Sequence, residues 1–195
     1  YLTERWLPAQ QLAVRPSTFA SYQAMLTKHV IPVLGPVSLQ QIAPDRLDRL
    51  YYDLVGVGLS TKTVRNIHVA LHKALRDAAR KNLVPRNAAE AADPPKLHRS
   101  NRPEMRTWTS TELRAFLDGI AAHRLGVAYL LAATTGMRRG EVLGLRWRDV
   151  DLDNRQLHVR QTWLTVNYQA ILGTPKTLRS QRRISLDPET IRALA

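Results

Sequence analysis

The chain has 195 residues, of which 44% are hydrophobic, so it is long enough to form one or two packed domains. It contains no cysteine, which excludes a disulfide-stabilised fold and suits a cytoplasmic protein, and no apolar run reaches the ~18 residues of a membrane span. The formal net charge is +13, and both halves of the chain are basic. This charge predicts a polyanionic partner, and nucleic acid suits it better than a membrane surface, because no basic amphipathic end with exposed aromatic residues is present. A generally basic protein without such a partner is the alternative.

The first 60 residues predict two amphipathic helices. The first is expected to begin at Ser17 or Thr18 as N-cap and to end within residues 32–35, which contain proline and glycine. The second is expected to begin near Pro44, since proline is favoured in a first turn, and to end at residues 56–58. Both have apolar residues at helical spacing, so each is expected to pack one face against a core.

A third helix is predicted to follow Ser60 as N-cap, and it separates apolar from basic residues. Its apolar residues share one face: Val64, Ile67, Leu71, Ala74, Leu75 and Ala78. Its cations share the opposite face: Lys62, Arg65, Lys73, Arg76 and Arg80. Asp77 is the only acidic residue in the helix, so pairing between residues four apart does not explain the basic face. The basic face is either a solvated surface or a phosphate contact, and the charge of the whole chain favours the contact.

The pattern predicts two domains and a linker. Residues 1–92 form a helical domain, the proline-rich residues 93–106 form the linker, and residues 107–195 form a second domain. In the second domain, Thr109 and Glu112 match a capping box, and residues 125–136 predict a nearly all-apolar, central helix. A further helix is expected over residues 140–150, then three short strands over residues 155–187, and then the start of a helix. The predicted fold class is mainly α with a small antiparallel β-sheet.

Two adjacent arginines, Arg138 and Arg139, lie at the joint between two apolar segments of the second domain. A charge there is costly to bury without a partner, so one arginine either reaches water or faces an anion. His68 and His72 have the spacing of zinc ligands, but no third ligand is evident, so no metal site is predicted. No glycine-rich phosphate loop and no serine-hydrolase elbow is present.

Lys176 is the only lysine among the 15 cations after residue 100, and it lies at the expected turn between the second and third strands. Arginine stays charged and can hold two phosphate oxygens at once, whereas lysine can give up a proton. Phosphoryl transfer needs both functions, because charge on the non-bridging oxygens must be held and the leaving oxygen must be protonated. Without such a context, a lysine in an exposed hairpin is a solvated residue.

Several segments together resemble the tyrosine recombinases, the phage-integrase family. "TTGMRRGEVLGLRWRDVDL" is similar to the family's first-arginine motif, and "TPKTLRSQRRISL" to its β-hairpin with a lysine. Upstream, "RPSTFASYQAMLTKHVIPVLG", "GLSTKTVRNIHVALHKALRDAARKNLVPRNAA" and "DPPK" resemble the helical core-binding domain and its linker. The resemblance covers essentially the whole chain in the family's order. It implies a core-binding domain, followed by the first part of an α+β catalytic domain, with the two domains clamping a DNA duplex.

The resemblance implies DNA cleavage and rejoining through a 3′-phosphotyrosyl intermediate, with neither metal nor cofactor. Arg138 then corresponds to the first catalytic arginine, Glu141 to an acidic residue that orients its neighbours, and Lys176 to the general acid for the 5′-hydroxyl. Arg139 is expected to be peripheral and, with the basic face of the third helix, to contact DNA. The family assembles as a tetramer on DNA, mainly through later sequence, so this chain alone is expected to be monomeric.

The family's His-x-x-Arg motif and its tyrosine nucleophile correspond to positions after residue 195. Tyr168 precedes Lys176, which is the wrong order for the nucleophile, and is expected to be a packing residue. We therefore expect this chain to bind DNA without cleaving it. The alternatives are a non-catalytic module that occupies recombination sites and a helical regulator with an unrelated basic domain.

Overall fold

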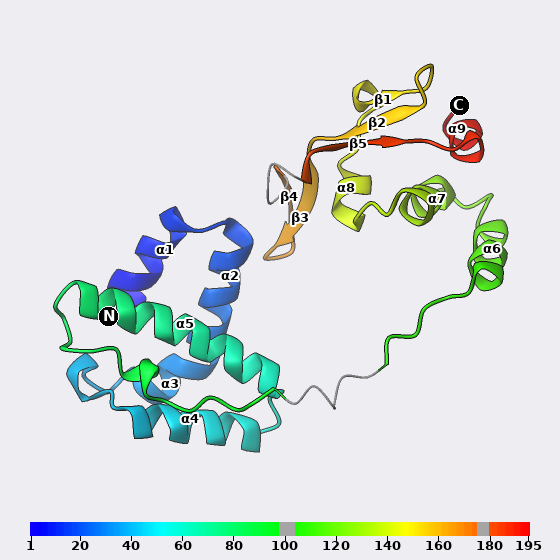
Figure 1. The fold of residues 1–195 in the computed structure, drawn as a ribbon. Helices are drawn as coiled ribbons and strands as arrows, with labels where there is room; N and C mark the ends of the chain where they lie inside the picture. The colour runs from blue at the N-terminus through cyan, green and yellow to red at the C-terminus, as the bar shows by residue number, and fades with distance from the viewer. Residues whose placement is uncertain (98–103, 175–179) are drawn as a thin grey trace. The chain divides into compact units, whose positions relative to one another are not determined.

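The computed structural model describes residues 1–97, 104–174 and 180–195 (Figure 1). The chain forms two compact units, Tyr1–Pro103 and Glu104–Ala195, so the division falls within the expected linker. The start of that linker is held by the first unit, because the Asp93 N–H donates to Asp48 Oδ1 over 2.6 Å and Arg65 donates to the Pro95 carbonyl over 3.3 Å. No helix in the described ranges combines the length and apolarity that crossing a membrane requires.

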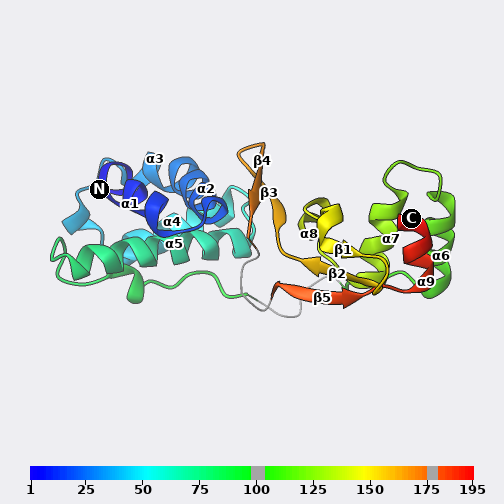
Figure 2. The ribbon, with the colours of Figure 1, turned by 90° about the horizontal axis from the view of Figure 1, so that it is seen from above.

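All elements assigned in the described part of the first unit are helical, and the long helix α5 packs beside the shorter helices α2 and α4 (Figures 1 and 2). Its elements are η1 (Leu2–Trp6), α1 (Leu7–Ala13), α2 (Pro16–Met25), η2 (Leu26–Val30), α3 (Ile31–Leu34), η3 (Leu39–Gln41), α4 (Pro44–Gly56), α5 (Thr61–Arg80) and η4 (Ala88–Glu90). The predicted apolar face of α5 is fully buried, which confirms the third helix and its orientation. The start of the chain packs on α5, since the Trp6 indole donates to Asp77 Oδ2 over 3.0 Å.

The first predicted helix differs from the structure at both ends. The N-cap is Arg15 rather than Ser17 or Thr18, and Pro16 occupies the first turn, where its missing N–H costs nothing. Pro32 does not end the helical path, which continues through η2 and α3 to Leu34. Because η2 is a π-helical turn, Pro32 falls in the first turn of a new α-helical segment and its lack of an N–H is tolerated.

The N-cap of α5 provides a test of local stability. The Ser60 hydroxyl accepts a hydrogen bond from the Thr63 N–H over 3.2 Å, as predicted. Replacing Ser60 with alanine is expected to lower the free energy of unfolding by about 1 kcal/mol, because that N–H loses its partner. Ser38 is a matched control, since it precedes η3 without a side-chain cap. Urea unfolding followed by circular dichroism measures both variants, and equal losses would contradict the assigned cap.

The described part of the second unit combines short helices with two antiparallel sheets. Its helices are α6 (Ser110–Gly119), α7 (Gly126–Thr135), α8 (Arg139–Leu143), η6 (Trp147–Asp149) and α9 (Pro188–Leu194). The predicted capping box of Thr109 and Glu112 begins α6. The single helix expected over residues 140–150 is instead α8 and η6. The apolar helix α7 packs on α6, α8 and α9. It was expected to be central, but only Gly126 and Leu131 are buried in it.

Among the described residues, the three expected strands correspond to five strands. They are β1 (Val150–Asp151), β2 (Gln156–Val159), β3 (Thr162–Val166), β4 (Gln169–Gly173) and β5 (Arg182–Ser185). One sheet has the order β1-β2-β5, and the other is the β3–β4 hairpin. The run predicted as a first strand divides after Val159, because β2 pairs with β5 whereas β3 pairs with β4. The core of the unit includes Leu157 and Val159 from β2 and Leu131 from α7.

Candidate active site

The joint between α7 and α8 presents Arg138 at the surface. Gly136 ends α7 in the left-handed region at φ 64°, where a side chain would be strained. Met137 then turns into the core at 4% exposure, and Arg138 is the extended N-cap of α8. This backbone path leaves 76% of the Arg138 side chain exposed. The arginine therefore reaches water from a joint whose neighbouring residue is buried.

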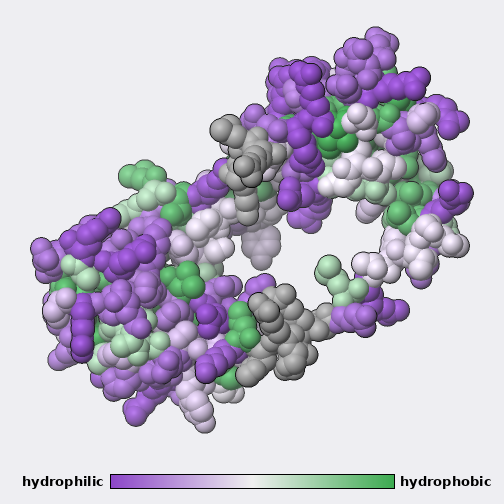
Figure 3. Space-filling model, in the orientation of Figure 1, coloured by the Kyte–Doolittle hydropathy of each residue, from purple (hydrophilic) through white to green (hydrophobic). Residues whose placement is uncertain are grey.

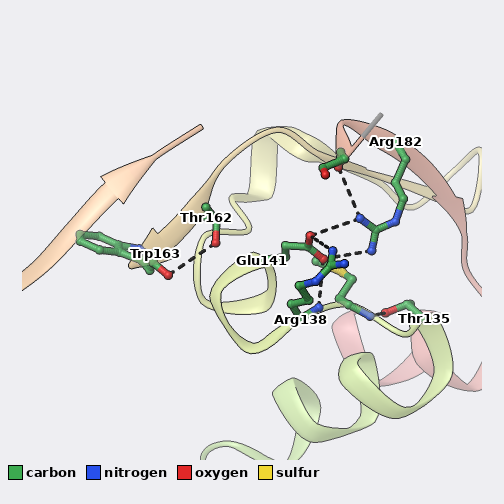
Figure 4. A network of polar contacts seen from close by, with 8 residues as sticks. Thr135, Arg138, Glu141, Thr162, Trp163 and Arg182 are labelled. Atoms are coloured by element: carbon green, nitrogen blue, oxygen red, sulfur yellow. Dashed lines mark hydrogen bonds and ion pairs between the residues drawn. The ribbon is translucent and has the colours of Figure 1, made fainter. Parts of the chain in front are cut away.

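Glu141 holds Arg138 through two contacts (Figure 4). The Arg138 main-chain N–H donates to Glu141 Oε2 over 3.0 Å, and the guanidinium Nη1 donates to Oε1 over 3.1 Å. The carboxylate itself is buried, with 5% of its side chain exposed. A buried carboxylate with fixed partners can orient the guanidinium, and the exposed part of that guanidinium can still bind an anion.

Arg182 on β5 holds the other side of the same carboxylate (Figure 4). Its Nη2 donates to Glu141 Oε2 over 3.0 Å, and its Nη1 donates to Oε1 over 3.3 Å. Arg182 is not among the site residues predicted from the sequence. The available signal was that Arg182 shares the strand face of apolar Ile184, and an arginine on a core-facing position needs a buried acidic partner.

The pKa of Glu141 lies below its usual value although burial acts to raise it. Hydrogen bonds from Arg182 and from the main chain and side chain of Arg138 stabilise the ionised form and outweigh desolvation. Glu141 is therefore a structural anion at neutral pH, and its two arginine partners stay charged. The site can hold negative charge at Arg138, but Glu141 is not poised to accept a proton.

A close approach between α8 and β3 fixes the position of this helix. A Cβ atom at Gly140 would collide with the carbonyl oxygen of Trp163 and the hydroxyl of Thr162, so only glycine fits. Gln161 adds a hydrogen bond to the Gly144 carbonyl over 2.8 Å. Gly140, which lies between Arg139 and Glu141 in the sequence, thus allows α8 to pack closely against β3.

The other predicted site residues of the second unit lie apart from this network or outside the described ranges. Arg139 is exposed and lies beside Leu143 and Trp163 in a shallow apolar hollow. Lys176 lies outside the described residues. Tyr168 was expected to be a packing residue, and this is wrong: it occupies the β3–β4 turn at φ 63° and is fully exposed.

The five predicted cations of α5 fall into two groups. Lys62, Arg76 and Arg80 are exposed, although Arg80 pairs with Asp77 over 3.4 Å. Lys73 and Arg65 are partly covered and have partners within the unit: Lys73 donates to Gln10 on α1 over 2.7 Å, and Arg65 donates to the Pro95 carbonyl. The helix face is therefore basic but only partly free, and its acidic residue does pair with a neighbour, at a spacing of three.

His68 and His72 have packing roles in the structure. The Tyr51 hydroxyl and His68 Nδ1 are 3.0 Å apart, and the two imidazole rings lie 5.9 Å apart. Burial, followed by the charges of His72 and Arg65, lowers the pKa of His68. Within the described ranges, no group of three His, Asp or Glu side chains is placed to hold a metal ion.

Comparison with known proteins finds relatives that are similar to nearly the whole chain. Residues 1–55 match the family described as phage integrase, N-terminal SAM-like domain. The ICEBs1 integrase of Bacillus subtilis (strain 168) is 27% identical over 191 residues, which cover 97% of this chain and 51% of that protein. The tyrosine recombinase XerC-like protein of Caldanaerobacter subterraneus subsp. tengcongensis is 25% identical, covering 97% of this chain and 52% of that protein. The chain is therefore similar to integrases and tyrosine recombinases along nearly its whole length.

The fold of the chain matches that of a solved integrase. The Tn1549 transposon integrase, in complex with transposon right end DNA, aligns over 96% of this chain and 62% of that chain with a TM-score of 0.77 at 21% identity. The helical first unit and the α+β second unit are thus the architecture expected from the resemblance. The chain spans about half the length of the relatives that it matches.

Proposed function

We propose that the protein carrying this chain cuts and rejoins duplex DNA through a 3′-phosphotyrosyl intermediate. The observation that supports this most directly is the Arg138–Glu141–Arg182 network, in which an exposed guanidinium is held by a buried, ionised carboxylate. In the proposed site, Arg138 binds the non-bridging oxygens of the scissile phosphate and stabilises the charge that develops in the transition state. Glu141 and Arg182 are positioning residues. Lys176 is assigned as general acid on the resemblance alone, and the proposed reaction uses no cofactor.

We further propose that the first unit is the core-binding domain and the second the leading part of the catalytic domain. Lys62, Arg76 and Arg80 on α5, together with Arg139, are the proposed contacts to DNA phosphates, because their charges are exposed. Lys73 and Arg65 add positive potential, but they are already bonded within the unit. The protein is proposed to act in the cytoplasm and to form a homotetramer on paired sites, as the family does.

Trapping a covalent adduct tests the proposed activity. The protein encoded by the full reading frame is incubated with a nicked duplex that carries the attachment site of this protein. Denaturing electrophoresis then separates free protein from protein linked to DNA. The expected result is a linked species that phosphodiesterase removes. Salt-dependent binding without a linked species would support the site-occupying module instead and would overturn the catalytic assignment.

A further inference from the structure

The outer face of the β1-β2-β5 sheet carries a cluster of cations that the proposed active site does not use. Along β2 and β5, side chains alternate between the core and the outside. Val159 and Arg182, which are register partners, point inward with Leu157 and Ile184, whereas the register partners His158 and Arg183 point outward. This second face lies opposite the Glu141–Arg182 network, so the two arginine groups belong to separate sites.

His158 lies between two guanidinium groups. Arg160 reaches its Nδ1 from Nη2 over 3.1 Å and from Nε over 3.3 Å, and Arg183 Nε lies 3.3 Å from its Nε2. Guanidinium groups only donate hydrogen bonds, and a neutral imidazole accepts at only one of its two nitrogens. At least one of these two arginines therefore faces the ring without an acceptor. An anion above the ring would supply the missing acceptor.

The acidic residues near this cluster already have partners within the second unit. Asp149, which is buried, accepts from Arg146 Nε over 2.5 Å and pairs with Arg160 over 3.4 Å. The hydrogen bond from Arg146 is the main reason that the pKa of Asp149 lies below its usual value. Asp151 accepts two hydrogen bonds from Asn154. No ion pair involving Arg148 or Arg183 occurs in the described structure, so the cluster retains positive charge.

These residues surround a hollow that is large enough for a phosphate group. It has a volume of about 420 Å³ and is lined by Arg148, Asp149, His158, Arg160 and Arg183, among others. The outward strand residues beside it are Gln156 and Ser185, both polar, and hydrophilic surface gathers over the β1–β2 end of the unit (Figure 3). A hollow lined mainly by charged and polar side chains gives a protein partner little apolar surface to bury, whereas arginine pairs match phosphate oxygens.

We propose that this face, defined by Arg148, His158, Arg160 and Arg183, binds backbone phosphates of nucleic acid at a site separate from the scissile phosphate. The proposal rests on DNA binding by the proposed function but not on cleavage. Arg148 and Arg183 donate to phosphate oxygens, while Arg160 is held by Asp149 and supports His158. The contact is to the backbone, so it adds affinity without reading sequence.

Salt-dependent binding of the 195-residue chain to a fluorescein-labelled duplex tests this site. The variant Arg148→Gln/Arg183→Gln is compared with Arg124→Gln/Arg192→Gln, which removes the same charge from exposed positions elsewhere in the unit. Loss of two phosphate contacts is expected to reduce the slope of log affinity against log salt by about 1.8, at about 0.9 for each contact. The control pair is expected to leave the slope unchanged. The same two results are expected when Arg138→Ala is added to each variant.

Each other outcome overturns the proposed site. An unchanged slope in Arg148→Gln/Arg183→Gln would show that these two arginines do not contact phosphates, although the chain would still bind DNA. Equal reductions of the slope in both double variants would show that the effect comes from the overall charge of the chain and not from this face. If Arg148→Gln/Arg183→Gln lost binding to labelled polyglutamate more than binding to the duplex, the face would bind an acidic polypeptide. Absence of salt-dependent binding in the wild-type chain would instead overturn the proposed function, together with this site.

Discussion

Replacing Glu141 with alanine is expected to lower the free energy of unfolding of the second unit by about 3 kcal/mol. The substitution leaves Arg182 without a carboxylate and frees the N–H that begins α8. Breaking a buried ion pair from one side costs about 3–5 kcal/mol, and the lower end applies because 31% of the Arg182 side chain is exposed. Hydrogen exchange should show faster opening of α8 and β5 amides, with α5 amides unchanged.

The control for this variant is Glu189→Ala, which removes an exposed carboxylate from the first turn of α9. It is expected to change stability by no more than about 0.5 kcal/mol. The pH dependence gives a second check with a defined sign. Because the folded-state pKa of Glu141 is below the ordinary value of 4.5, its contribution is fully present above that value and is lost as pH falls through the folded-state pKa. The stability difference between wild type and Glu141→Gln should therefore shrink in acid, and a difference that grew in acid would contradict the assigned network.

The helices of the first unit were predictable because their periodicity is local. Every residue of the predicted apolar face of α5 is buried, and Ser60 caps the helix as expected. The basic face was placed correctly on the helix, but a helical wheel does not show what covers a face. Lys73 lies on that face and is nevertheless partly covered, because α1 and α2 bring Gln10 and the Tyr22 ring to its ammonium group.

The candidate site was only partly predictable, because its residues come from distant parts of the chain. Arg138 and Glu141 are three residues apart, so the local motif places them together. Arg182 is 41 residues from Glu141 in sequence, and their contact depends on the pairing of β5 with β2. That pairing requires the run over residues 155–167 to divide into two strands in different sheets. Alternation within a strand cannot predict which strand is its partner.

In the protein encoded by the full reading frame, replacing Arg138 with alanine is expected to slow adduct formation by about 100- to 1,000-fold. DNA affinity is expected to change little. The guanidinium binds the phosphate most tightly when charge develops on its oxygens, so its loss affects the transition state more than the bound duplex. The fold should survive, because 76% of the side chain is exposed and the main-chain N–H still donates to Glu141. Single-turnover trapping on a nicked duplex measures the rate, and fluorescence anisotropy measures affinity.

Arg139→Ala is the matched control, since the neighbouring arginine is also exposed but makes no contact with Glu141 in the described structure. It should weaken binding modestly and leave the trapping rate at saturating protein unchanged. Arg138→Lys should recover only part of the rate, because an ammonium group keeps the charge but cannot donate to two phosphate oxygens in the guanidinium geometry. If Arg138→Ala and Arg139→Ala slowed trapping equally, or if affinity fell as far as the rate, Arg138 would be a phosphate clamp and not the catalytic arginine.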